Sequence, residues 1–186
     1  MKPLIRTVDF ISEWSGRVVM WLALILFVVT AYETIQRYLF RVTSVALQET
    51  TWHLYSFLFL LGMAYTLRHD RHVRVDIFYD RMSERAKAGI NLFAILLLVI
   101  PFCLLMIGFS WKFMLTAYQI GERSGDPGGL PARWILKAAI PAGFGLLLLQ
   151  GISEIFKSLL TLFQNKKWAT PSQKPDVQKG APRWNI

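Results

Sequence analysis

Four long runs of apolar residues, separated by short polar segments, dominate the pattern of this chain. They cover about residues 18–40, 51–67, 90–111 and 134–156. Because the hydrocarbon core of a bilayer is roughly 30 Å thick, a helix needs about 20 residues to cross it. Each run is long enough to cross, with some tilt and a polar residue near one end. The pattern therefore predicts an all-α integral membrane protein with four transmembrane helices and a membrane domain over residues 18–163.

The segment before the first run has a helical periodicity of its own. Leu4, Val8, Ile11 and Trp14 recur at spacings of three and four residues, which predicts a short amphipathic helix. Such a helix either lies flat at the membrane surface and turns into the first span near Gly16, or extends that span. Residues 1–17 are thus expected to form an N-terminal interfacial segment or a continuation of the first helix.

The connections between the runs differ in character. The second, about residues 68–89, places apolar residues between charges and predicts another helix on the membrane surface. The third, residues 121–133, is rich in Gly and Pro and should not form a regular helix. Residues 164–186 are polar with several prolines, which predicts a disordered tail.

Small residues and prolines mark the last two runs. Pro101 and Pro141 lie inside them and should kink their helices, because proline removes a backbone hydrogen bond. Small residues at helical spacing in the fourth run allow another helix to approach closely. The candidates for contact with another subunit on this basis are Ala138, Ala142 and Gly145.

The distribution of Lys and Arg predicts the orientation of the chain in the membrane. The hydrophobic fraction is 54 %, yet the net charge is +9. Of the 21 Lys and Arg residues, 15 lie before the first run, in the second connection or after Glu154, and 6 lie elsewhere. The positive-inside rule then places both termini and the second connection in the cytoplasm. Because topology accounts for the positive charge, no nucleic-acid partner is expected.

Two pairs of an acidic and a basic residue, each four residues apart, lie near the opposite, external face. Glu33 and Arg37 lie four residues apart, so they share a helix face and can pair. They either contact another helix or subunit or form an internal pair. Glu49 and His53 repeat the spacing at the start of the second run, where a polar cluster joining the first two spans is favoured over a proton relay. Glu33, Arg37 and Glu49 are all candidates for a subunit interface.

Metal binding and catalysis have little support. His69, His72 and nearby aspartates superficially resemble metal ligands, but Arg68, Arg71 and Arg74 surround them and repel a divalent cation. These arginines are better suited to lipid headgroups. The sequence contains no nucleophile elbow, zinc-protease signature or phosphate-binding loop. We therefore expect no metal, no cofactor and no enzymatic activity.

Several short stretches, in order along residues 10–160, resemble the small membrane subunit of tripartite ATP-independent periplasmic (TRAP) transporters, the DctQ family. They are Arg-Tyr-Leu-Phe at 37–40, Gln-Glu at 48–49, Gly-Met-Ala-Tyr-Thr-Leu-Arg at 62–68, His-Val-Arg-Val-Asp at 72–76, Leu-Pro at 130–131 with Trp134, and Pro-Ala-Gly at 141–143. The third connection is richer in Gly and Pro than the usual family pattern.

The resemblance implies a role in a bacterial inner membrane. A periplasmic binding protein would capture an organic acid, and a large membrane subunit would import it with an ion gradient. This chain would act as a scaffold beside the large subunit and offer external surface to the binding protein. The competing hypothesis is a stand-alone channel or exporter formed by oligomerisation. Four spans without an internal repeat do not favour a self-sufficient transporter.

Overall fold

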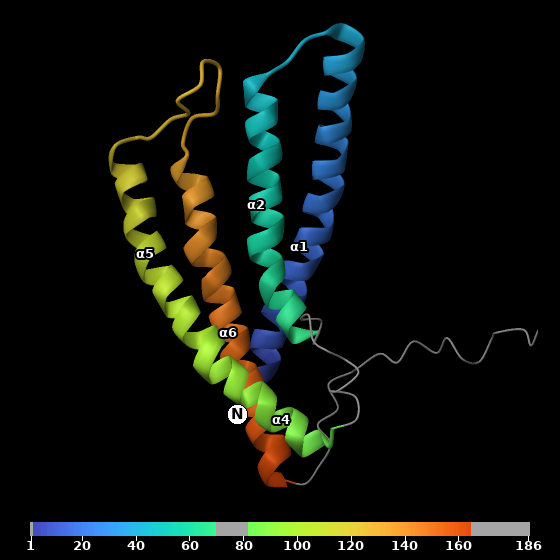
Figure 1. The fold of residues 1–186 in the computed structure, drawn as a ribbon, viewed down its shortest axis with the longest axis vertical. Coiled ribbons are helices and arrows are strands. Elements are labelled where there is room, and N and C mark those ends of the chain that lie inside the picture. Colours follow the sequence, from blue (N-terminus) through green and yellow to red (C-terminus); the bar gives the residue numbers. More distant parts are fainter. Residues whose placement is uncertain (1, 70–81, 165–186) are drawn as a thin grey trace, which may run out of the picture.

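The computed structural model describes residues 2–69 and 82–164, and within these ranges the chain is helical apart from short connections, with no strand. The elements in chain order are α1 (Lys2–Ile35), the π-helical η1 (Gln36–Phe40), α2 (Val45–Arg68), α4 (Glu84–Ala94), the π-helical η2 (Ile95–Val99), α5 (Ile100–Gln119) and α6 (Trp134–Gln164). Figure 1 shows them as an elongated bundle in which α6 lies between α2 and α5. The predicted all-α architecture is confirmed.

The two ends of this bundle can be named from the chain. The start of α1 and the end of α6 lie at one end, which we call the terminal end (Figure 1). Residues 41–44 and 120–133 lie at the other, which we call the loop end (Figure 1). The predicted cytoplasmic placement of the termini concerns the terminal end and stays a prediction.

Three described stretches are long and apolar enough to cross a membrane: Ile5–Phe40, Arg85–Gln119 and Trp134–Phe163. The fourth predicted span corresponds to α2, which has 24 residues but is not among the three. Its loop-end half carries Glu49, Thr51 and His53, and these lower its hydropathy. The membrane crossing of α2 therefore stays a prediction.

Of the two arrangements predicted for residues 1–17, the turn near Gly16 is absent, because α1 continues through this residue without a break. A Cβ atom at position 16 would lie only 2.1 Å from Cδ2 of Tyr65. Glycine is needed here so that the ring of Tyr65 on α2 can pack against the backbone of α1. The N-terminal amphipathic residues thus extend the first helix, which was the other predicted possibility.

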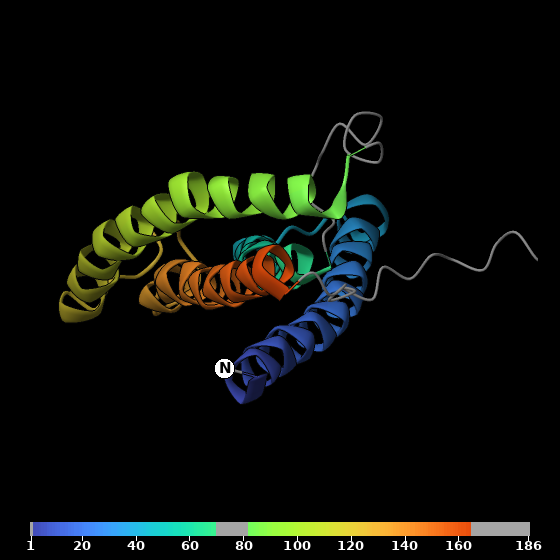
Figure 2. The same ribbon diagram turned by 90° about the horizontal axis from the view of Figure 1, so that it is seen from below.

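The third helix is longer than the predicted run and curved. It begins at Glu84, where the side chain of Ser83 caps the helix by accepting from the N–H of Ala86, and it continues through η2 to Gln119. Figure 2 shows the bend along this helix. The π-helical turn directly precedes Pro101, whose missing N–H cannot close a regular α-helical hydrogen bond.

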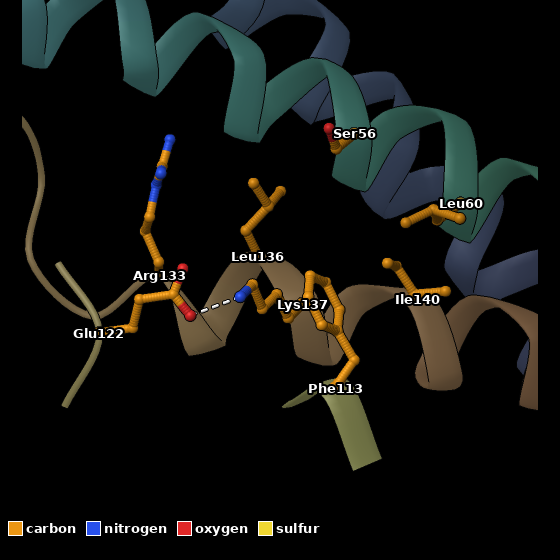
Figure 3. A pocket seen from close by; sticks show the side chains of 8 residues that line it. All are labelled: Ser56, Leu60, Phe113, Glu122, Arg133, Leu136, Lys137 and Ile140. Carbon is orange, nitrogen blue, oxygen red and sulfur yellow. Dashed lines mark hydrogen bonds and ion pairs between the residues drawn. The ribbon is translucent and has the colours of Figure 1, made fainter. Parts of the chain in front are cut away.

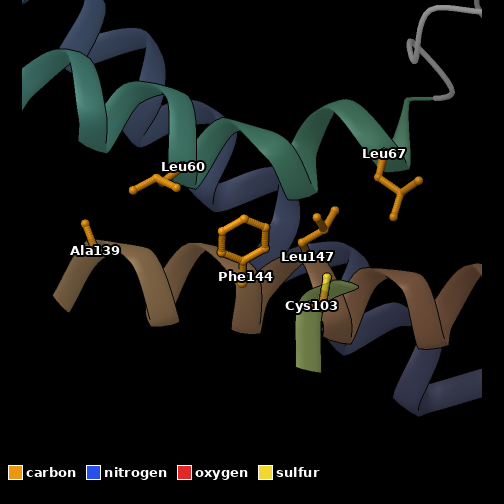
Figure 4. Packing of buried hydrophobic residues seen from close by; sticks show 6 residues of the cluster. All are labelled: Leu60, Leu67, Cys103, Ala139, Phe144 and Leu147. Atoms are coloured by element: carbon orange, nitrogen blue, oxygen red, sulfur yellow. The ribbon is translucent and has the colours of Figure 1, made fainter. Parts of the chain in front are cut away.

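The core lies where α6 meets α2 and α5. Six buried residues form a cluster there, and Figure 4 shows their packing: Leu60, Leu67, Cys103, Ala139, Phe144 and Leu147. The backbone of Gly143 touches Leu60, since a Cβ atom there would lie 2.8 Å from Leu60 Cβ and O. Small residues thus bring α2 and α6 together, as predicted for close helix packing.

Large apolar side chains cover much of the outer surface. On α1, Trp21 is 69 % and Phe27 is 71 % exposed, and none of the residues in its most apolar window is buried. A soluble protein rarely exposes so large an apolar surface. The surface suits lipid or another membrane-embedded subunit. The predicted helix of the second connection lies mainly in residues 70–81, which are outside the described residues. The predicted disordered tail, residues 164–186, also lies outside them except for Gln164, which ends α6.

Candidate functional sites at the two ends of the bundle

Glu49 anchors the Gly- and Pro-rich loop at the loop end. Its carboxylate is buried, with 1 % of the residue exposed. It accepts hydrogen bonds from the hydroxyl of Ser124 and, at 2.6 Å, from the backbone N–H of Leu130. The guanidinium of Arg133 lies 3.7 Å from Oε1. The start of α2 and residues 121–133 are therefore joined through one carboxylate.

These contacts favour the ionised form of Glu49, which lies just before the predicted second span. The hydrogen bond from Ser124, and then that from Leu130, hold the pKa of Glu49 below its ordinary value, although burial opposes the shift. The carboxylate thus remains charged at neutral pH. His53, four residues on, has Nδ1 2.6 Å from the backbone oxygen of Glu49.

Glu33 and Arg37 pair with each other, as their spacing allowed. Arg37 Nη2 donates to Glu33 Oε1 at 2.7 Å, and the hydroxyl of Thr51 donates to Glu33 Oε2 at 3.4 Å. This pair links α1 to α2 at the loop end, whereas Glu49 turns toward the loop. The predicted polar cluster of Glu49 and His53 joining the first two spans is therefore wrong for Glu49, whose partners lie in the loop, and Glu33 makes the polar contact between α1 and α2. The side chain of Arg37 is about half exposed and remains accessible to another molecule.

A cavity of about 310 Å³ lies below the loop, between α2, α5 and α6. Its lining residues are Ser56, Leu60, Phe113, Glu122, Arg133, Leu136, Lys137 and Ile140. Figure 3 shows the charged residues toward one side, with Leu60 and Ile140 toward the other. Lys137 pairs with Glu122, and its Nζ lies 3.8 Å from the centre of the Phe113 ring.

A second polar cluster, which the sequence did not predict, lies at the terminal end. The amide nitrogen of Gln150 donates to Asp9 at 3.2 Å and to Glu154 at 2.9 Å, while its oxygen accepts from Ser12 at 2.6 Å. Lys157 donates to the same two carboxylates at 2.8 Å each. Gln150 is fully buried. The cluster therefore fastens the first turns of α1 to the last turns of α6.

A signal for this cluster was present in the sequence. The polar residues Gln150, Ser153, Glu154 and Lys157 recur at spacings of three and four, and so do Asp9 and Ser12. Each set lies on one helix face. Their partnership was not predictable, because 148 residues separate Asp9 from Lys157.

Arg68 ends α2 beside this cluster and makes protein contacts. Its Nη1 donates to Glu13 and, at 2.7 Å, to the backbone oxygen of Asp9. His69 stacks on Tyr65, with ring centres 4.1 Å apart. The other two candidates for lipid headgroups, Arg71 and Arg74, lie outside the described residues. Within residues 2–69 and 82–164, no group of three His, Cys, Asp or Glu side chains is placed to hold a metal ion.

The small residues of α6 lie on two faces. Ala139 and Gly143 are buried against α2. Ala142 is exposed, Ala138 is half-buried, and a Cβ atom at Gly145 would meet nothing within 4 Å. The exposed residues Ile135, Leu149 and Ile152 continue this second face along the helix. The α6 outer stripe, defined as residues 135, 138, 142, 145, 149 and 152, is thus open to a further helix.

Apolar helices long enough to cross a bilayer, with charges paired at the two ends, define a helical integral membrane protein. The family model described as the DctQ component of tripartite ATP-independent periplasmic transporters matches residues 26–161. Because this match covers well over half of the 186 residues, the chain belongs to the DctQ family, and the resemblance found in its motifs is confirmed. None of the curated proteins compared with the chain matches it.

Proposed function

We propose that this chain is the small permease subunit of a TRAP transporter that imports organic acids across a bacterial inner membrane, driven by an ion gradient. Family membership supports the role of a transporter component that works with a large membrane subunit and a periplasmic binding protein. The chain itself serves as a scaffold for the large subunit and carries no substrate site. Both termini face the cytoplasm, so the loop end faces the periplasm.

The observation that carries the scaffold role is the separation of the two polar clusters. Glu49 and its partners lie at the loop end, and Gln150 and its partners at the terminal end. Between them, the described residues pack the apolar core around Leu60, Phe144 and Leu147. An ion or carboxylate crossing this chain would lose its hydration without gaining a polar path. The geometry therefore favours a supporting subunit over a channel.

The α6 outer stripe is the surface proposed to contact the large subunit. Ala142 is exposed and its neighbours are small, which allows a second helix to approach closely. The accessible guanidinium of Arg37, paired with Glu33, offers a second proposed contact with the large subunit at the loop end of the first helix. Lipid covers the remaining apolar surface.

The loop of residues 121–133 is the surface proposed to receive the periplasmic binding protein. Residues 125–128 are exposed, while Glu49 holds the loop on both sides of them through Ser124 and Leu130. A loop held in this way presents a defined surface and loses little conformational freedom when a partner binds.

The α6 contact can be tested with one bulky substitution. Ala142→Trp should sharply reduce co-purification of the large subunit and abolish uptake by the complete system, while substrate binding to the isolated periplasmic protein stays unchanged. Ala23→Trp is the matched control, because Ala23 is an exposed alanine on α1. Loss of the large subunit with Ala23→Trp, but not with Ala142→Trp, would move the contact to α1 and contradict this assignment.

The alternative is a stand-alone channel or exporter formed by several copies of this chain. The exposed apolar faces of α1 and α5 would allow such an oligomer. A stand-alone channel or exporter would transport without a large subunit. Reconstitution of this polypeptide alone into vesicles therefore distinguishes the channel hypothesis from the scaffold role.

A further inference from the structure

The cavity below the loop combines a charged end with an apolar end. Arg133 and Glu122 lie at the loop end, where α6 begins. Leu60 and Ile140 lie further along α2 and α6, toward the middle of the bundle (Figure 3). Its volume of about 310 Å³ is at the lower end of the range for small-molecule sites. The cavity therefore extends from the loop end toward the middle of the bundle, along the direction of the helices.

The two basic side chains that line the cavity differ in the number of partners they have. Lys137 has both the carboxylate of Glu122 and the ring of Phe113 as partners. The guanidinium of Arg133 has no hydrogen bond from its side chain to any of the described residues, and the nearest carboxylate oxygen, on Glu49, is 3.7 Å away. Its side chain is 35 % exposed. Arg133 is thus the group at this site that can still bind an anion.

The ion pair between Arg133 and Glu49, at 3.7 Å, leaves the N–H donors of the guanidinium available to a phosphate. That carboxylate already accepts from Ser124 and Leu130, which hold it in place. A guanidinium is planar and offers parallel N–H donors that match two phosphate oxygens. An acyl chain would in turn cover the apolar wall formed by Leu60 and Ile140.

We propose that this cavity binds part of one glycerophospholipid of the outer leaflet, with the phosphate at Arg133 and the adjoining part of one acyl chain between Leu60 and Ile140, while the rest of the lipid lies outside the cavity. The bound lipid would fill the space between α2 and α5 and complete the surface of the chain at that depth. The binding of a lipid rests on the cavity and not on the transport role, whereas the choice of the outer leaflet rests on the proposed topology.

Lipid retention by the purified protein tests the proposal. The full chain, with any subunits that co-purify, is extracted in mild detergent, and native mass spectrometry measures phosphatidylethanolamine and phosphatidylglycerol bound to this polypeptide. Wild type should retain one phospholipid, and Arg133→Gln should retain roughly tenfold less, because a charge-assisted bidentate contact is lost. Arg123→Gln is the matched control, since Arg123 is exposed on the same loop. It should retain lipid like wild type.

A second variant tests the apolar half. Ser56→Phe fills the cavity from α2 without changing a charge, and it too should lower retention. This variant carries the test if Arg133→Gln fails to accumulate. Equal lipid retention in wild type, Arg133→Gln and Ser56→Phe would overturn the proposal. Displacement of the lipid by millimolar inorganic phosphate would also overturn it, because the site would then recognise a free anion and not a lipid.

Discussion

Gly143 is the position at which one added methyl group should most clearly disturb the packing of this chain. A Cβ atom there would lie 2.8 Å from Cβ and O of Leu60, and 3.0 Å from its carbonyl carbon. Two of these three atoms belong to the backbone of α2, so a rotamer change cannot relieve the contact. Gly143→Ala should therefore push α2 away from α6, and overpacking of this kind costs roughly 1–3 kcal/mol.

Gly108 provides the matched control for this substitution. It lies in α5, and a Cβ atom there would meet nothing within 4 Å. Both replacements gain helix propensity of up to about 1 kcal/mol, so their difference isolates the contact with Leu60. We expect the unfolding free energy of Gly143→Ala to be lower than that of Gly108→Ala by roughly 1–3 kcal/mol.

Thermal unfolding of the purified full chain in detergent measures this difference. For a chain of this size, 1 kcal/mol shifts the midpoint by about 2–4 °C. The apparent midpoint of Gly143→Ala should thus fall clearly below that of Gly108→Ala. A midpoint for Gly143→Ala at or above that of the control would refute the close packing of α2 on α6.

Three further predictions concern the polar clusters and the topology. Hydrogen exchange in residues 121–133 should be roughly tenfold faster in Glu49→Ala than in wild type, because the N–H of Leu130 loses its acceptor, and unchanged exchange in the variant would refute the anchor. Because the folded pKa of Glu49 is depressed, wild-type protection should be complete above the ordinary carboxyl pKa of about 4. It should be lost as the pH falls through the lower folded pKa. Gln150→Leu should destabilise the chain by roughly 1–3 kcal/mol in thermal unfolding, because Ser12 and the two carboxylates lose a buried partner, whereas Gln119→Leu at an exposed position should be neutral; equal midpoints for the two variants would contradict the cluster. In a Cys103→Ala background, an impermeant thiol reagent should label intact cells carrying Gly125→Cys but not those carrying Ser83→Cys, and the reverse pattern would invert the topology.

The spacing of residues along the chain predicted contacts correctly where both partners lie on one helix. The Glu33–Arg37 pair was predictable because residues four apart on a helix are neighbours. The irregular loop at 121–133 was predictable from its Gly and Pro content, and the bend of the third helix from Pro101. In each case the cause lies within a few residues of its effect.

Contacts between segments far apart in the chain could not be predicted from the sequence. The carboxylate of Glu49 binds Leu130, 81 residues away, and no spacing rule connects them. Gly16 suggested a turn, but its role is to admit Tyr65 from another helix. Small residues occur on two faces of α6, and only the fold shows that Gly143 packs inward while Ala142 is exposed.

In the proposed function, this chain supports a larger permease and does not transport by itself. The most direct measurement is ion-gradient-driven uptake of organic acids by vesicles containing this polypeptide alone, the large subunit alone or both, each with the periplasmic binding protein added. We expect uptake only when both membrane subunits are present. Uptake by vesicles containing this polypeptide without the large subunit would contradict it.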